Sequence, residues 1–197
     1  MLSISQKMNR FLSSFDYPSD KERRFLLNSE MTKMMESGHN CYSCVGHCCT
    51  FAYNSMQVTP LEALDCLLFL HEESRVDQAL VERLEETVKS YRLDYEILIG
   101  GSRSMRRQYT CPFFEAGPKG CTISKHSKPY GCLAFNPLER NVSIEGKCKS
   151  QISLLEKHDH EMSRYDDLNE RIKESLKLSW NKKNLPVALL DLIKKFQ

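Results

Sequence analysis

The sequence lacks the long apolar run that a membrane-spanning helix requires. No stretch approaches the roughly 20 consecutive apolar residues that cross a bilayer. It also lacks a charge excess, with 28 Lys and Arg against 26 Asp and Glu and a formal net charge of +2. A nearly neutral chain gives no reason to expect binding to a membrane or to nucleic acid. We therefore expect no membrane partner and do not favour nucleic acid as a partner.

The N-terminal residues lack the apolar core of a secretory signal peptide. Helical spacing instead places four apolar residues on one face, which predicts an ordinary amphipathic helix: Met8, Phe11, Leu12 and Phe15. Without a signal peptide we expect a cytoplasmic protein, in a compartment that keeps thiols reduced. Nine cysteines in such a compartment are more typical of metal ligands or catalytic thiols than of disulfides.

Apolar spacing predicts helices through most of the chain. They are expected over residues 20–37, from 60 to about 73, from about 76 to 98, and near 149–160, 163–179 and 185–196. The start at residue 60 is the clearest, because Thr59 can cap the helix, Pro60 suits its first position and Glu62 can complete a capping box. Residue 66 is a cysteine among leucines of this helix, and we expect a buried structural thiol there.

Residues 102–149 differ from the rest because glycine, proline, cysteine and aromatic residues concentrate there. The segment around residues 109–124 is typical of a short β-hairpin that turns at Gly117-Pro118-Lys119-Gly120. The predicted fold is mainly α, with helices flanking an irregular cysteine-rich metal-binding knot that contains this hairpin. We divide the chain into an N-terminal helical segment (1–38), a cysteine-cluster domain (39–149) and a C-terminal helical segment (150–197).

Eight cysteines form two groups. The first is Cys41, Cys44, Cys48 and Cys49, in which the two-residue gap lets the first two sulfurs reach one ion. If the chain turns helically there, Cys44 and Cys48 share a face, whereas Cys48 and Cys49 diverge by roughly 100°. The doublet therefore indicates two adjacent metal centres, or one cluster with a further thiol beside it.

The second group is Cys111, Cys121, Cys132 and Cys148. Gly120 and Gly131 each precede one of these cysteines, which relieves backbone crowding where sulfurs converge. The segment 102–149 carries nine Lys and Arg against three Glu. Because ligating thiols are deprotonated, a basic surround would offset their charge. The alternatives are an anion site centred on residues 103–107, for phosphate or nucleic acid, and a solvated basic face.

Several other cysteine chemistries fit the sequence poorly. A zinc ribbon normally has two CxxC knuckles and this chain has one, and a c-type haem site needs CxxCH but Val45 follows Cys44. The CxxxCxxC signature of radical S-adenosylmethionine enzymes is incomplete, because Phe51 stands where its third cysteine would be. A thioredoxin-like site needs a strand before CxxC, and the surrounding sequence does not indicate one. His158 and His160 lie about 200° apart on a helix and are interpreted as surface residues.

Three further motifs accompany the cysteine groups: Cys111-Pro112-Phe113, Gly120-Cys121-Thr122-Ile123 and residues 128–135 (KPYGCLAF). With these motifs, the sequence resembles a cysteine-cluster family. This is the CxxCxxCC-type family of zinc- or iron-chelating domain proteins, often labelled iron–sulfur cluster proteins. The resemblance covers roughly residues 41–148. It implies a metal site built by the eight cysteines, and a distant relation to flagellin lysine methylases, although no S-adenosylmethionine-binding motif is recognisable here.

The metal predicted from these residues is an iron–sulfur cluster or zinc. Four-thiolate sites suit both, and eight cysteines suffice for two of them. Proline after Cys111 and the aromatic residues that could shield a cluster favour iron–sulfur over zinc, with mononuclear iron as a further option. We expect a role in redox chemistry, metal handling or structural support. One alternative is a cluster-containing group-transfer enzyme that resembles a protein lysine methylase and acts on a protein substrate. Another is a zinc-stabilised interaction module that binds a protein partner. No catalytic residue is assigned.

Overall fold

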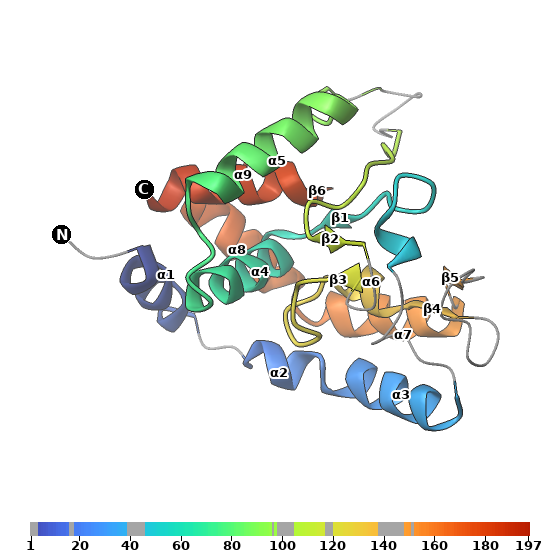
Figure 1. The fold of residues 1–197 in the computed structure, drawn as a ribbon. Coiled ribbons are helices and arrows are strands. Elements are labelled where there is room, and N and C mark those ends of the chain that lie inside the picture. The colour runs from blue at the N-terminus through green and yellow to red at the C-terminus, as the bar shows by residue number, and fades with distance from the viewer. Residues whose placement is uncertain are drawn as a thin grey trace.

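The computed structural model describes residues 4–15, 18–38, 46–95, 97, 105–116, 120–137, 148–150 and 152–197. Its helices are α1 (Ile4–Ser13), α2 (Asp20–Arg23), α3 (Phe25–Glu36), the 3₁₀-helix η1 (His47–Cys49), α4 (Pro60–Glu72), α5 (Gln78–Tyr91), α6 (Tyr130–Leu133), α7 (Ile152–Ser163), α8 (Asp166–Leu176) and α9 (Leu185–Phe196). Its strands are β1 (Gln57–Val58), β2 (Phe114–Glu115), β3 (Gly120–Cys121), β4 (Phe135–Pro137), β5 (Cys148–Ser150) and β6 (Lys183–Asn184). The fold is mainly helical, as predicted (Figure 1).

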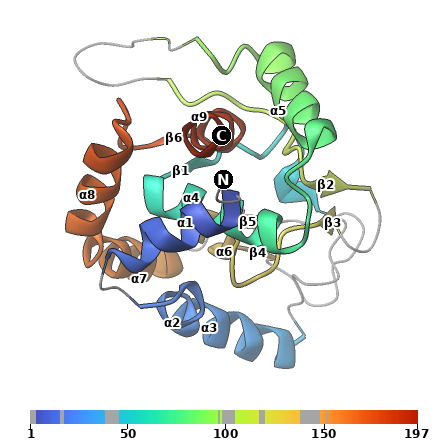
Figure 2. The same ribbon diagram turned by 90° about the vertical axis from the view of Figure 1, so that its left-hand side faces the viewer.

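Helix α4 lies at the centre of the largest hydrophobic core. Its start follows the sequence prediction: the Thr59 hydroxyl accepts a hydrogen bond from the Glu62 backbone N–H, and the Glu62 carboxylate accepts one from the Thr59 N–H. Helices α9, α8 and α1 pack against α4, and α5 packs against α9 (Figures 1 and 2). The predicted apolar face of α1 is also confirmed, since Met8 and Leu12 are buried in this core.

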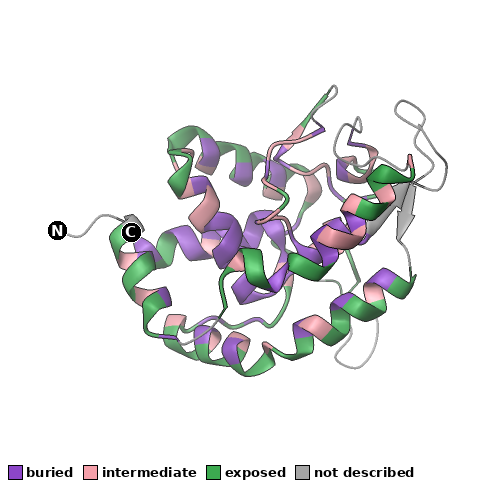
Figure 3. Cartoon of the chain, turned by 90° about the horizontal axis from the view of Figure 1, so that it is seen from below, coloured by how far each residue is buried: buried purple, intermediate pink, exposed green. Residues whose placement is uncertain are grey.

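The core draws on residues from all three ranges into which the sequence was divided, and that division stays a prediction. Buried side chains of α1, α4 and α9 belong to one cluster. Figure 3 shows that the helices present buried residues inward and exposed residues outward. Cys66 on α4 is fully buried in this core, as expected for a structural thiol. Among the described helices, none is long and apolar enough to cross a membrane.

The strands are short antiparallel pairs that join distant segments. β2 pairs with β3 in the register Phe114 opposite Cys121, which confirms the predicted hairpin strands, although positions 117–119 of the predicted turn lie outside the described residues. β1 pairs with β6, so that the segment before α4 lies beside the segment before α9. β4 pairs with β5 and brings Cys148 opposite Pro137.

The expected single helix over residues 20–37 is divided at Arg24 into α2 and α3. The apolar face predicted for it is wrong at its start, because Phe25 and Leu26 are 66% and 54% exposed while Arg23 and Arg24 are buried. The buried carboxylate of Asp65 on α4 pairs with both arginines and compensates for burying them.

Candidate metal centre

The two cysteine groups meet through backbone hydrogen bonds between residues 49–54 and 109–111. The Cys111 N–H donates to the Cys49 carbonyl at 2.7 Å, and the Tyr109 N–H donates to the Asn54 carbonyl at 3.0 Å. The Asn54 side-chain amide returns a hydrogen bond to the Tyr109 carbonyl at 3.0 Å. These bonds hold Cys49 and Cys111 at a fixed separation although the two residues are 62 positions apart in sequence.

A tight turn places the cysteine doublet on the hairpin. Gly46 adopts the left-handed conformation, with φ of +78°, and η1 begins directly after it. A Cβ atom at Gly46 would lie 2.9 Å from the Cα atom and the carbonyl oxygen of Gly120, so the turn packs directly on β3. Glycine is needed at residue 46 for both reasons, since a side chain would be strained and would clash.

The Cys49 thiol interacts with three other thiols as a result. The Cys49 thiol hydrogen bonds with the thiols of Cys48, Cys111 and Cys121. Hydrogen bonding with Cys111, and then with Cys121, raises the pKa of the Cys49 thiol, while the hydrogen bond with Cys49 lowers the pKa of the Cys121 thiol. Cys121 is therefore the member of this group in which the anionic thiolate is favoured, and Cys49 is the one that keeps its proton.

Cys132 lies near the four thiols. It is on α6, and its electrostatic interactions include Cys48 and Cys121. Loss of hydration raises the pKa of Cys132, with further contributions from these neighbouring thiols. The structure therefore places five of the eight predicted ligands in one region of the molecule, and the metal-binding knot stays a prediction.

The remaining predicted ligands are less fully placed. Cys41 and Cys44 lie outside the described residues, and with them the predicted shared face of Cys44 and Cys48. The backbone of Cys148 is described in β5. This strand pairs with β4, which follows α6 in the chain. Cys66 lies in the hydrophobic core against which Cys111 and Cys121 pack, and burial, followed by the charge of Cys121, raises the pKa of its thiol.

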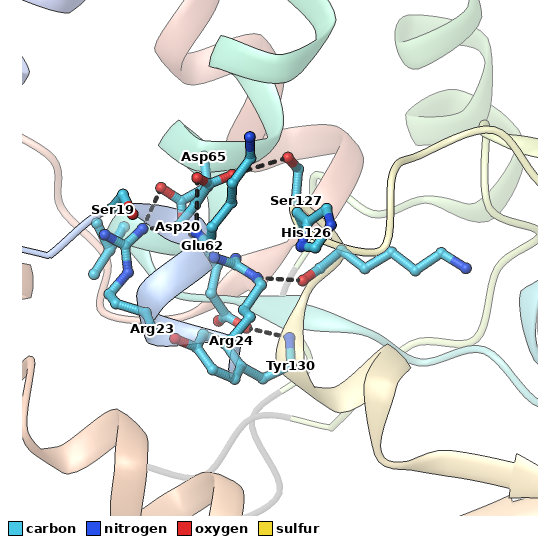
Figure 4. Close-up of polar contacts among 12 residues, drawn as sticks. Ser19, Asp20, Arg23, Arg24, Glu62, Asp65, His126, Ser127 and Tyr130 are labelled. Atoms are coloured by element: carbon cyan, nitrogen blue, oxygen red, sulfur yellow. Dashed lines mark hydrogen bonds and ion pairs between the residues drawn. The ribbon is translucent and has the colours of Figure 1, made fainter. Parts of the chain in front are cut away.

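Basic side chains surround this site. Lys128 hydrogen bonds with the Cys121 thiol and lowers its pKa further. Arg24 donates from Nε to the Lys128 carbonyl at 3.0 Å and from Nη1 to Asp65 at 2.8 Å, as Figure 4 shows. Positive charge from Lys128, which belongs to the predicted basic segment, therefore lies beside Cys121. Arg103 of that segment lies outside the described residues.

Residues of α2, of α4 and of the junction between α2 and α3 hold segment 127–130 in place. The Tyr130 N–H donates to the Glu62 carboxylate at 2.8 Å, and the Ser127 hydroxyl donates to Asp20 at 3.2 Å (Figure 4). The Arg24 guanidinium lies 4.7 Å from the centroid of the Tyr130 ring, a cation–π contact. These contacts fix the start of α6 and thereby position Cys132.

The chemistry of the donor set suits a soft metal. Thiolates prefer zinc, cuprous copper and iron–sulfur clusters, and two thiolates on one tetrahedral zinc lie about 3.8 Å apart, given Zn–S bonds of about 2.3 Å. Among the described residues, however, no group of three or more His, Cys, Asp or Glu side chains has the arrangement of a metal site.

A cavity of about 290 Å³ adjoins the cysteines. Its lining includes Cys48 and Cys132, the cations Arg106 and Lys182, and His158 of α7. The interpretation of His158 as a surface residue is wrong, because only 7% of it is exposed. The sequence contains a signal for this burial: Leu154, His158 and Met162 are spaced four residues apart, so His158 lies on the buried stripe of the helix.

No family model, no curated protein and no solved structure matches this chain significantly.

Proposed function

We propose that this chain is a metal-binding protein, in which the eight cysteines hold an iron–sulfur cluster or zinc. The observation that carries the proposal is the contact of the Cys49 thiol with Cys48, Cys111 and Cys121, drawn from three separate segments. Thiols that bind a metal lose their protons, and the bound cation compensates the negative charges that result. The resemblance to the cysteine-cluster family is consistent with this proposal.

One proposed ligand is favoured as a thiolate. Lys128 supplies positive charge beside Cys121. Phe113 and Tyr130 are almost fully buried nearby and would restrict solvent access to a bound metal. An iron–sulfur cluster would provide one-electron transfer, whereas zinc would provide a redox-inert cross-link between the two cysteine groups. Cys111-Pro112 and the aromatic surroundings keep iron–sulfur as the preferred choice.

The test is the metal content of the full chain after anaerobic purification, measured by elemental analysis. We expect stoichiometric iron with inorganic sulfide and a brown colour, or colourless protein that contains zinc. A Cys49→Ala variant should lose most of the metal, because Cys49 is the thiol that contacts the other three. A Cys66→Ala variant is the matched control and should retain it, since Cys66 is buried in the core. Folded wild-type protein without metal would contradict the proposal.

The second candidate is a group-transfer enzyme, and the cavity that contains Arg106 beside Cys48 and Cys132 favours it. The same cavity counts against a purely structural zinc module, for which we expect no adjoining pocket. Its volume of about 290 Å³ lies at the lower limit for small-molecule sites, which hold ligands in about 300–1,000 Å³. A bulky donor such as S-adenosylmethionine would therefore fit poorly. Thermal stabilisation by S-adenosylmethionine would support the enzyme, and no stabilisation would count against it.

A further inference from the structure

The cavity beside Cys48 and Cys132 contains a buried imidazole whose hydrogen-bonding capacity is unused. His158 is 7% exposed, and its ring packs on Tyr130 with 4.7 Å between ring centroids. Within the described part of the chain, neither ring nitrogen has a hydrogen-bond partner, and Nδ1 has only a 3.4 Å contact with the Asp159 carboxylate. A buried polar group without a partner is costly, so this ring is suited to a polar ligand in the cavity.

The two cations of the cavity are free to bind an anion. Arg106 and Lys182 are exposed and come from separate segments, and neither forms an ion pair with any residue that the structure describes. Two carboxylates also belong to the lining. Glu62 already accepts hydrogen bonds from Thr59 and Tyr130, and Asp159 has a side chain that is 73% exposed and therefore well screened. Both signs of charge therefore line the cavity, and the cations Arg106 and Lys182 are the groups that can hold an anion there.

The rest of the lining limits the size and character of the ligand. Met56, Leu155 and Met162 provide apolar contact surface. The volume of about 290 Å³ is appropriate for a small metabolite. A neutral imidazole offers one donor and one acceptor, so His158 can bind a hydroxyl, a carboxylate or a phosphate oxygen.

We propose that this cavity binds a small organic acid whose carboxylate or phosphate is held by Arg106 and Lys182, with His158 hydrogen bonded to a polar group of the ligand beside Cys48 and Cys132. The inference deepens the proposed function, on which it rests, because it places a small-molecule ligand next to two of the proposed metal ligands. A ligand bound at an adjoining anion site can reach the metal centre and can be acted on there. A closed structural site does not allow this.

The test is isothermal titration calorimetry of the full chain, as purified, with succinate and with inorganic phosphate in separate experiments. Binding of succinate alone identifies a carboxylate ligand, and binding of phosphate alone identifies a phosphate ligand. An Arg106→Gln variant should weaken the binding about tenfold, the effect of losing one charged hydrogen bond. Arg107→Gln is the matched control: it removes the same charge one position away, where the guanidinium donates to the Tyr91 carbonyl and lines a neighbouring pocket that shares Lys182 but not Arg106 or His158 with the cavity. It should leave the affinity within about twofold, because its hydrogen bond is elsewhere.

A His158→Phe variant keeps a ring against Tyr130 and removes both nitrogens, and it should also weaken binding about tenfold. Should this variant fail to fold, the exposed Arg106 still decides the question. Binding of neither probe overturns the inference, as does equal affinity of the Arg106→Gln and Arg107→Gln variants. Elemental analysis of the same samples separates this result from the proposed function. Metal without probe binding rejects only the ligand site, and probe binding without metal rejects only the metal centre.

Discussion

Asp65 is the residue on which the packing of the N-terminal helices most depends. Its carboxylate contacts the guanidinium groups of both Arg23 and Arg24, and the side chains of all three residues are at most 4% exposed (Figure 4). A buried ion pair is weak evidence for net stabilisation, because desolvation offsets the attraction. Removing one member is different, since it leaves the other charges buried without compensation.

An Asp65→Asn variant should therefore lower the free energy of unfolding by about 3–5 kcal/mol, as measured by urea denaturation. Glu30→Gln is the control, since Glu30 pairs with Lys33 and Lys157 at the surface. It should cost at most about 1 kcal/mol. Similar losses in the two variants would show that the contact between α2, α3 and α4 does not depend on the Asp65 charge.

His158 makes stability depend on pH. Burial lowers its pKa below the ordinary value of 6.5, so the folded chain favours the neutral imidazole. As the pH falls below about 6.5, the unfolded chain takes up a proton before the folded chain does, and stability declines until the folded-state pKa is passed. Between pH 7.5 and pH 5.5, wild-type protein should lose more unfolding free energy than a His158→Phe variant. Parallel pH profiles of the two proteins would contradict this account.

Residue type and spacing predicted part of the site. The sequence grouped the Cys48-Cys49 doublet with Cys111 and Cys121, and the structure shows interactions of the Cys49 thiol with these three cysteines. Their role as metal ligands, and that of Cys148, stays a prediction. The burial of His158 could have been predicted from its spacing to Leu154 and Met162. The burial of Arg24 could not, because the carboxylate that compensates it lies 41 positions away in sequence.

At the scale of elements, the turn at Gly46 joins the cysteine doublet to β3. Its left-handed backbone and its 2.9 Å approach to Gly120 leave no room for a side chain. Gly131 on α6 presents a contrast. A Cβ atom there would lie 2.8 Å from the terminal methyl group of Met56, which is the flexible end of a side chain and can move.

A Gly46→Ala variant should lose about 2–4 kcal/mol of unfolding free energy, combining the strain of a left-handed alanine with the clash against backbone. Gly131→Ala should lose about 1 kcal/mol or less, because the Met56 side chain can adapt. Urea denaturation of both variants provides the comparison. If Gly131→Ala proves the more harmful change, the turn at Gly46 does not position the doublet as described.

Helix boundaries could be predicted where the signal is local. The start of α4 is correct because Thr59, Pro60 and Glu62 lie within four residues and specify their own cap. The end of α5 is wrong by several residues: the helix was expected to reach residue 98, but Arg92 adopts a left-handed conformation that ends it after Tyr91. The strand pairs β1–β6 and β4–β5 were not predicted, because two- or three-residue strands depend on a distant partner.

At the scale of the whole molecule, Cys111 and Cys121 pack against the hydrophobic core to which α4, α5 and α9 contribute. A metal would add a bridge beside this core that joins residues 46–49 to the segment 111–132. Because a metal that binds only the folded chain adds its binding free energy to stability, chelation should lower the melting temperature. We expect this loss in wild-type protein and none in a Cys49→Ala variant that no longer holds the metal. Removal of metal with an unchanged melting temperature would contradict a stabilising role.

The most direct test of the central claim is X-ray absorption spectroscopy of anaerobically purified wild-type protein at the edge of the metal that it contains. The account predicts a first shell dominated by sulfur, at about 2.3 Å from the metal. For an iron–sulfur cluster, a second shell of iron would accompany it. A first shell of nitrogen and oxygen alone, or protein with no metal to measure, would contradict the assignment of these cysteines as metal ligands.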